Sequence, residues 1–416
     1  MFTRRALLVL VCLALVLSLS GSILAAKKVV ITYGNFSAGK DNEPTLNAMK
    51  AAFEKAHPDI EVKLQSTGYG EYFRVIQTQV AGGTAPDCYE LNYENFVTFA
   101  AKNVLTDLGP LFQSAGMDFD AYDENALRAF NYRGKQFGVP VSYSVVLLFY
   151  NKDLFDKAKV PYPTNDWTWK DVIEAGKKIR ALGDDIFGII QGVHFWEFYK
   201  VIEQNNGSLF NADRTKFTVN SPENVEALQY MVDKVIKYNI EPTQAQKSNQ
   251  GDWDLFSAGR AGMLITGNWS FTYMKENAKF PWDVVVEPGN KRKACHFFSN
   301  GLVINKASKN KDAALKWIKW LSSSRESCTL RVNAAWETPP ISDPEIIKLY
   351  TSQTPPDNRK AVFESLKYLV TPPVVEQFNE MAQIIDVQLQ KARDGEKTPK
   401  QALDDAQKEL EQKIKL

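Results

Sequence analysis

The chain has 416 residues, and its 50 Lys and Arg nearly balance its 49 Asp and Glu, which gives a formal net charge of +1. With no basic excess, the composition favours neither a nucleic-acid partner nor an anionic-lipid surface. The length allows two or three domains of roughly 150 residues each. Beyond the N-terminal segment the cysteines are Cys88, Cys295 and Cys328, whose spacing is typical of neither a disulfide scaffold nor a zinc site. We therefore expect buried thiols with at most one disulfide, and no metal or cofactor.

The first 26 residues have the pattern of an export signal. Arg4 and Arg5 precede an apolar run over residues 6–19, and small residues such as Ala25 and Ala26 follow it. This order of charged, apolar and small-residue regions predicts a signal peptide over 1–26, cleaved near Ala26. No cysteine lies in the cleavage zone, so we expect a periplasmic protein without a lipid anchor. A retained N-terminal anchor is the alternative.

The next segment alternates strands and helices. Strands are predicted over 29–33, 60–64 and 88–91, and helices over 44–56 and 72–80, because the apolar residues change from strand to helical spacing. This order predicts parallel strands in a doubly wound α/β sheet. Ligands bind such sheets beyond the carboxyl ends of the strands. Those ends carry residues 35–37, 67–69 and 92–95.

Strands and helices continue to be predicted as far as the C-terminus. Further strands are predicted over 139–150, 185–190 and 261–266, and further helices over 169–182, 222–237 and 311–321. The last helix opens with Thr398-Pro399-Lys400-Gln401, a capping box with proline at the first helical position. These elements predict two α/β lobes.

The strand over 261–266 ends in Gly267-Asn268-Trp269. An indole face suits the apolar face of a sugar, and an amide suits its hydroxyl groups. We therefore predict that Trp269 and Asn268 contact a carbohydrate. The competing interpretation is a core tryptophan after a tight turn.

Several segments resemble the family-1 extracellular solute-binding proteins of ABC transporters, the sugar-binding group that includes maltose-binding protein. They occur in family order and span most of the chain after residue 50: FEKAHPDIEVKL (from Phe53), AGGTAPDCYELN (from Ala81), RGKQFGVPVSYSVVLLFYNKDLF (from Arg133), FTVNSPENVEALQYMVDKV (from Phe217), FSAGRAGMLITGNWS (from Phe256) and GLVINKASKNKDAALKWIKWLSS (from Gly301).

The resemblance implies a two-lobed periplasmic-binding-protein fold with an interlobe ligand cleft and hinge crossovers. Lobe 1 would comprise residues 27–140 and 296–340, and lobe 2 residues 141–295 and 341–416. A monomer with this fold would bind a small carbohydrate by hinge closure, without catalysing a reaction, and would deliver it to ABC transporter permease subunits at the membrane.

The predicted ligand-binding residues come from the strand ends and from positions matched by the resemblance. They are Asn35, Phe36, Ser37, Tyr69, Asn92, Tyr93, Glu94, Tyr143, Ser144, His194, Trp196, Asn268, Trp269, Asn300 and Trp336. Each has a structural alternative; Trp336 could cover a turn, and Trp196 could be packing. By contrast, Trp317 and Trp320 lie three apart on a helix and are predicted to pack in a core or between the lobes.

Two other functions remain open. A secreted carbohydrate-active enzyme needs two carboxylates across one bond, and the sequence has many acidic residues. The same fold could instead bind a polyamine, iron or a phosphate ester. The predicted cleft segments are rich in asparagine and aromatic residues and poor in Arg and Lys, which favours a neutral polyhydroxylated ligand.

Overall fold

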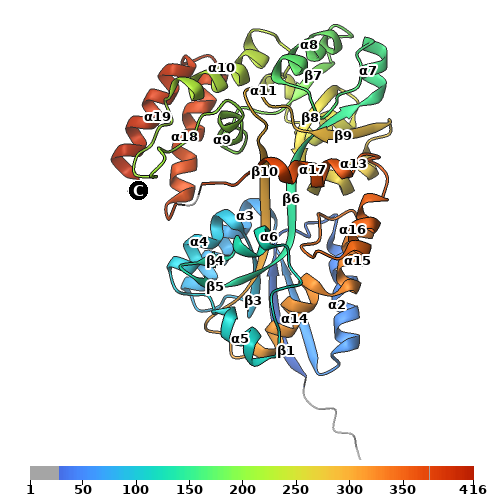
Figure 1. Cartoon of the computed structure of the whole chain (residues 1–416), viewed down its shortest axis with the longest axis vertical. Helices are drawn as coiled ribbons and strands as arrows, with labels where there is room; N and C mark the ends of the chain where they lie inside the picture. Colours follow the sequence, from blue (N-terminus) through green and yellow to red (C-terminus); the bar gives the residue numbers. More distant parts are fainter. Residues whose placement is uncertain (1–27, 374) are drawn as a thin grey trace, which may run out of the picture.

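The computed structural model of the protein describes residues 28–373 and 375–416, so the predicted signal peptide lies outside the described residues. The two lobes lie one above the other in Figure 1, and the long strands β6 and β10 run between them. The described part of the chain contains no helix long and apolar enough to cross a membrane.

The first lobe is built on the predicted strand and helix repeats. Its elements in chain order are β1 (Val29–Asn35), α2 (Glu43–Ala56), β2 (Ile60–Ser66), α3 (Tyr69–Ala81), β3 (Cys88–Asn92), α4 (Tyr93–Ala101), α5 (Leu108–Ser114), α6 (Glu124–Arg128), β4 (Asn131–Tyr132) and β5 (Lys135–Gln136). Strand β1 pairs in parallel with both β2 and β3, which confirms the predicted parallel arrangement. Helix α14 (Lys311–Ser323) closes the core, where Trp317 packs on Trp320 and Phe53.

The strands of the second lobe continue the nine-stranded sheet that begins in the first lobe, and most of the described helices lie in this second lobe. Its elements are α7 (Lys152–Ala158), α8 (Trp169–Arg180), β7 (Phe187–Ile190), α9 (Phe195–Gln204), α10 (Pro222–Ile236), α11 (Gln244–Lys247), α12 (Asp252–Ser257), β8 (Ala261–Gly267), the 3-10 turn η1 (Asn268–Ser270), α13 (Phe271–Asn277), β9 (Trp282–Val286), α18 (Phe378–Arg393) and α19 (Pro399–Lys413). Helix α19 begins as predicted, with the Thr398 hydroxyl accepting from the Gln401 amide at 3.2 Å.

Strand β6 (Gly138–Asn151) connects the first-lobe and second-lobe parts of this sheet, and it is buried along its whole length. The strand order is β2-β1-β3-β10-β6-β8-β7, with β9 also paired to β6. Strand β10 (Cys295–Ile304) pairs antiparallel with β6 from Phe297 to Val303, so the sheet is mixed where the crossovers pass. This continuous ribbon of two paired strands is what joins the lobes.

The chain passes the junction a third time after β10. An isolated bridge pairs Thr338 with Tyr143 of β6. The elements around this passage are α15 (Arg325–Asn333), α16 (Pro344–Thr351), α17 (Lys360–Ser365), η2 (Leu366–Tyr368) and β11 (Leu369–Val370). Cys88, Cys295 and Cys328 are buried free thiols, as expected for small apolar side chains.

Candidate functional site

Polar side chains gather where β1, β2 and β3 of the first lobe end. The Asn35 amide donates to the Ser66 hydroxyl at 3.1 Å, and Asn92 lies within 3.5 Å of the Tyr69 hydroxyl. Asn95 in turn donates to the Asn92 side-chain oxygen at 2.9 Å. We call Asn35, Tyr69, Asn92 and Glu94 the polar cluster. Their proximity follows from the parallel pairing, which places the carboxyl ends of neighbouring strands at one sheet edge.

Glu94 is the buried charge of this cluster. One of its carboxylate oxygens accepts from the Asn92 amide, and the other is buried with no hydrogen-bond partner in the described part of the chain. Burial raises the pKa of Glu94 to about 7. The Asn35 side-chain oxygen is also buried and unpartnered among the described residues. A buried acceptor without a partner carries a desolvation cost, and a hydrogen bond donated by a ligand would offset that cost.

Aromatic side chains gather where the second lobe meets the crossover strand β10. Ring centroids are 6.0 Å apart for Trp196 and Phe298, and 5.5 Å apart for Trp269 and Phe298. The Tyr199 ring stacks on His296 at 4.4 Å, and His296 lies 4.9 Å from Phe298. We call Trp196, Tyr199, Trp269, His296 and Phe298 the aromatic cluster. Flat rings with a few polar atoms between them are typical of small-molecule sites.

Gly267 determines how Trp269 is placed in that cluster. A Cβ at Gly267 would lie 1.9 Å from a carbon of the Trp269 ring, so only glycine lets the indole fold back onto the backbone here. The η1 turn that follows carries Trp269 to the edge of β8, where its ring is half-buried.

Two histidines near the cleft have unpartnered nitrogens. His296 Nδ1 lies 3.3 Å from the Tyr199 hydroxyl, while its Nε2 is buried without a partner among the described residues. Burial, aided by Lys200, lowers the pKa of His296 well below its usual range, so the ring is neutral. His194, at the N-terminus of α9, has a buried Nδ1 in the same state.

The two clusters lie close together: the polar cluster belongs to the first lobe, while the aromatic cluster combines Trp196, Tyr199 and Trp269 of the second lobe with His296 and Phe298 of the crossover strand β10. Burial and, next, the Glu94 carboxylate raise the pKa of Tyr199. Asn379 of α18 donates to the Asn95 side-chain oxygen of α4 at 3.3 Å, and Arg133 lies 3.9 Å from Glu376. The lobes therefore touch along the side where α4 faces α18.

Other predicted residues lie at the junction of the lobes, bound to protein groups. Glu337 accepts hydrogen bonds from Ser142, from Ser144 at 3.1 Å and from Asn300 at 3.2 Å. Tyr143 stacks on Phe297 with ring centroids 5.7 Å apart. Ser144 and Asn300 therefore bind the Glu337 carboxylate, and Tyr143 packs against Phe297. All three side chains hold the crossover strands together.

Trp336 and Asn268 are similarly enclosed. Trp336 is only 2% exposed and packs in the first-lobe core, with the Arg331 guanidinium 4.0 Å above its ring. Asn268 is fully buried; its oxygen accepts from the Val145 amide at 2.9 Å, and its nitrogen donates to Thr338 and Tyr350. Both amide hydrogens are therefore used by the protein.

The segment after β1 packs beside the polar cluster. Phe36 lies against Tyr69, Tyr72 and Phe73, and Tyr69 is 51% exposed. The backbone amides of Phe36 and Ser37 donate to Glu90, at 3.2 and 3.1 Å. Burial, together with the nearby Glu337 carboxylate, raises the pKa of Glu90 to about 7. The buried Glu90 carboxyl thus fixes the backbone of Phe36 and Ser37 through their amides.

Sequence reasoning missed three members of the aromatic cluster: Tyr199, His296 and Phe298. Tyr199 follows Trp196 by three residues on α9, and His296 precedes Phe298 by two on β10. These are the spacings that put side chains on one face of a helix and of a strand. These spacings are visible in the sequence, but using them required knowing which face of α9 and which face of β10 point to the cleft.

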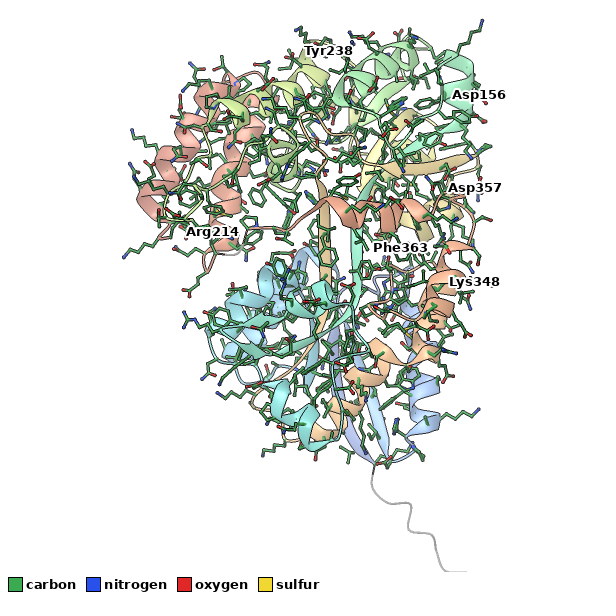
Figure 2. The ribbon with its side chains drawn as sticks, in the orientation of Figure 1. Asp156, Arg214, Tyr238, Lys348, Asp357 and Phe363 are labelled. Carbon is green, nitrogen blue, oxygen red and sulfur yellow. The ribbon has the colours of Figure 1, made fainter. Side chains whose placement is uncertain are left out.

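The structure also contains two hollows, one that shares Tyr199 with the aromatic cluster and one that contains no residue of either cluster. One cavity of about 430 Å³ lies between the lobes, lined by Tyr93 of the first lobe and by Tyr199, Glu203 and the loop containing Arg214 of the second. Figure 2 shows Arg214 on the side of the second lobe that faces the first.

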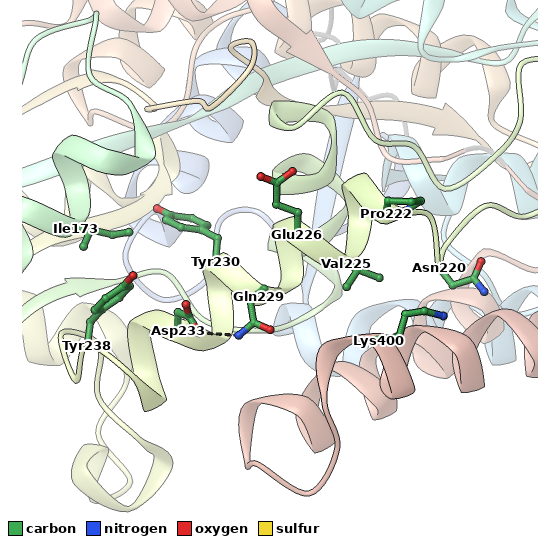
Figure 3. Close-up of a pocket in the computed structure, with 10 residues that line it drawn as sticks. All are labelled: Ile173, Asn220, Pro222, Val225, Glu226, Gln229, Tyr230, Asp233, Tyr238 and Lys400. Carbon is green, nitrogen blue, oxygen red and sulfur yellow. Dashed lines mark hydrogen bonds between the residues drawn. The ribbon is translucent and has the colours of Figure 1, made fainter.

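A shallower groove of about 620 Å³ lies on the outer surface of the second lobe (Figure 3). It runs between α8, α10 and α19, with Tyr230, Tyr238 and Lys400 along it, and Gln229 donates to Asp233 at 2.6 Å within it. It contains no residue of either cluster. Across the described residues, no group of three or more His, Cys, Asp and Glu side chains is arranged to hold a metal ion.

Comparison with known proteins gives consistent similarities. Residues 39–326 match the model of a family described as bacterial extracellular solute-binding protein. A structure of an ABC substrate-binding protein from Listeria monocytogenes in complex with cycloalternan is 44% identical, with a TM-score of 0.89, over 93% of this chain and 99% of that one. The arabinooligosaccharide-binding protein of Bacillus subtilis (strain 168) is 24% identical over 88% of both chains. Maltose-bound MalE3 of T. maritima shares the fold, with a TM-score of 0.79 at 23% identity over 92% of this chain and 99% of that one.

Proposed function

Because the chain belongs to the bacterial extracellular solute-binding proteins, as its six segments predicted, we propose that it is the receptor of an ABC importer for an oligosaccharide. It captures the sugar between its lobes and delivers it to permease subunits at the membrane. The Listeria protein crystallised with cycloalternan makes an oligosaccharide of that kind the first ligand to test.

The observation that carries this proposal is the opposition of the two clusters. The aromatic cluster offers flat apolar faces, and the polar cluster offers buried acceptors without partners, at Glu94 and Asn35. A sugar has both complements, because its ring C–H groups form apolar faces and its hydroxyls donate hydrogen bonds. The Asn35 amide and a neutral His296 offer no positive charge, and the Glu94 carboxyl repels an anion once it ionises, so the site suits a neutral ligand better than an anion.

We propose that the ligand contacts Asn35, Tyr69, Asn92, Glu94, His194, Trp196 and Trp269, together with Tyr199, His296 and Phe298. Tyr93 borders the same space. For Phe36, Ser37, Tyr143, Ser144, Asn268, Asn300 and Trp336, the contacts described above support a structural role beside or behind the ligand.

The proposal is one of binding without catalysis. The relatives are binding proteins of transporters, and closure of two lobes around a ligand needs no reaction. Mass spectrometry of the bound sugar after prolonged incubation distinguishes binding from catalysis, because an enzyme would return a cleaved or rearranged product.

The remaining expectations complete the proposal. We infer export by a signal peptide over residues 1–26 and residence in the periplasm, in line with the extracellular family. The boundaries of lobe 1 (27–140 and 296–340) and lobe 2 (141–295 and 341–416) are proposed to mark the moving bodies, with a monomer as the functional unit.

The decisive experiment is thermal unfolding of the protein from Lys27 against a panel of sugars including cycloalternan, maltose and longer linear oligosaccharides. Binding to the folded state alone adds about 2.7 kcal/mol at a ligand concentration one hundred times Kd, which raises the midpoint measurably. A shift with related sugars supports the proposal. Shifts only with polyamines, iron or phosphate esters would replace the ligand class.

A further inference from the structure

In each lobe, a buried glutamate accepts hydrogen bonds from a loop that adjoins proposed sugar contacts. The first-lobe loop is formed by residues 36–37, directly after Asn35 at the end of β1. The second-lobe loop is formed by residues 191–192, which follow β7 and lead to His194. Both loops leave a strand that pairs in parallel with its neighbour, and they leave it at the carboxyl end, where α/β sheets bind ligands.

The acid of the first lobe is Glu90, which lies on β3 beside β1 and is fully buried. One of its carboxylate oxygens accepts from the backbone amides of Phe36 and Ser37, at 3.2 and 3.1 Å. These amides follow the last residue of β1, and a buried backbone amide needs an acceptor. The Glu90 carboxylate supplies it and thereby fixes the two residues that come directly after Asn35.

The acid of the second lobe is Glu241, which lies after α10 and is only 1% exposed. One of its oxygens accepts from the amide of Gln191 at 3.0 Å and also from the amide of Gly192. The Lys234 ammonium group lies 3.2 Å from the other oxygen. The hydrogen-bond pattern is therefore the same in both lobes, with one carboxylate oxygen and two consecutive loop amides.

Each of these loops packs directly against a proposed sugar contact. Gly192 has a φ of +83°, and a Cβ there would lie 2.7 Å from a carbon of the His194 ring, so only glycine fits at this position. In the first lobe, the Phe36 ring packs against Tyr69 of the polar cluster, with ring centroids 5.6 Å apart. A shift of either loop would therefore move a side chain of the proposed site.

We propose that Glu90 and Glu241 are positioning residues for the sugar, which hold the two loops in the binding geometry by accepting hydrogen bonds from consecutive backbone amides. Consecutive amides of this kind form a small concavity that suits an anion. A side chain that supports a binding loop from behind affects affinity without touching the ligand. This inference rests on the proposed function and deepens it, because it assigns part of the affinity to two residues outside the set of sugar contacts.

The test compares a side chain that accepts hydrogen bonds with an apolar one of similar size at each position. In the first lobe, E90Q keeps a side-chain oxygen for the loop amides and E90L removes it. In the second lobe, E241Q and E241L are each combined with K234M, because a lone ammonium group would otherwise stay buried. The control is E54L, which removes an acid that accepts from the Val62 amide at 2.8 Å, within β2 and outside both loops. Where circular dichroism shows that a leucine variant is unfolded, alanine takes its place.

Hydrogen–deuterium exchange in the absence of sugar measures how firmly the loops are held. We expect E90L to speed exchange of the amides of residues 36–37 by at least about tenfold and to leave residues 191–192 unchanged. The second-lobe leucine variant should do the reverse, and the glutamine variants should keep both loops protected. Equal exchange in the glutamine and leucine variants of one position overturns the assignment of that acid.

Isothermal titration calorimetry with cycloalternan then measures the effect on affinity. Each leucine variant should bind at least about tenfold more weakly than its glutamine partner, while E90Q and E54L stay within about threefold of the unsubstituted protein. Unchanged affinity in a folded leucine variant overturns the positioning role, even where its loop exchanges faster. If neither cycloalternan nor the other sugars of the panel bind the unsubstituted protein, the proposed function fails and the role in sugar binding fails with it, while the exchange rates still decide whether the acids hold the loops.

Discussion

Replacement of Glu94 by glutamine isolates the energetic effect of a buried acid in the candidate site. Burial raises the pKa of this carboxyl from 4.5 to about 7 in the folded protein. An acid whose folded pKa is raised holds its proton more tightly in the folded state, so it lowers stability as pH rises from about 4.5 to about 7. At about 1.4 kcal/mol for each tenfold change, the full effect above pH 7 is on the order of 3 kcal/mol.

Glutamine has the shape of the protonated acid and cannot ionise. In the absence of sugar, Glu94→Gln should therefore match the unsubstituted protein near pH 4.5 and become more stable than it as pH rises to 8. The difference approaches about 3 kcal/mol where the acid is fully charged. Glu276→Gln, the same change at an exposed site on α13, is the control and should show no such trend.

The assay is the urea unfolding midpoint of the three proteins at pH 5, 6, 7 and 8. The reasoning is refuted if the gap between Glu94→Gln and the unsubstituted protein is the same at every pH, or if the variant is the less stable protein at pH 8. Glu90 and Glu287 share the direction of the pKa shift, so the comparison of variants, not the pH profile of one protein, carries the test.

Three further substitutions probe other parts of the molecule. Trp269→Ala should weaken sugar binding by about 1–3 kcal/mol in calorimetry, because it removes one aromatic face, and unchanged affinity in a folded variant would exclude that contact. Lys200→Met should lower unfolding stability by roughly 3–5 kcal/mol, because the buried carboxylates of Glu197 and Glu287, each 2.7 Å from its ammonium group, lose their shared partner. Asn268→Ala should lower stability by about 1–3 kcal/mol, since it leaves buried groups unpaired, and a midpoint equal to that of the unsubstituted protein would contradict the hydrogen bonds described here.

The fold was largely predictable because its elements have strong local signals. The parallel strands around β1 alternate with helices whose apolar residues keep helical spacing, and the cap of α19 lies at Thr398, where the sequence predicts it. The sequence did not predict that the sheet combines parallel and antiparallel strands. Antiparallel pairing of β10 with β6 joins residues more than 140 positions apart, and no local pattern records such a partner.

The candidate site was predictable only in part, since sequence neighbours point to different sides. Asn268 and Trp269 are adjacent, and both were predicted to contact the ligand. The η1 turn separates them, so that the amide of Asn268 binds Val145, Thr338 and Tyr350 while the indole lies at the sheet edge against Phe298. The same division holds at Trp336-Glu337, where the tryptophan packs under Arg331 and the carboxylate binds the crossover strands.

These enclosed polar residues hold the segments that carry the aromatic cluster. The Asn268 amide fixes the end of β8 to β6 and to the third crossing of the chain, and Trp269 is the next residue. Asn300 lies on β10, the strand that also carries His296 and Phe298 of the same cluster, and it donates to Glu337. Buried polar groups are costly unless their hydrogen bonds are complete, so each of these anchors holds its segment in one position. The orientation of the aromatic cluster is thus a property of the lobe junction as much as of the cleft.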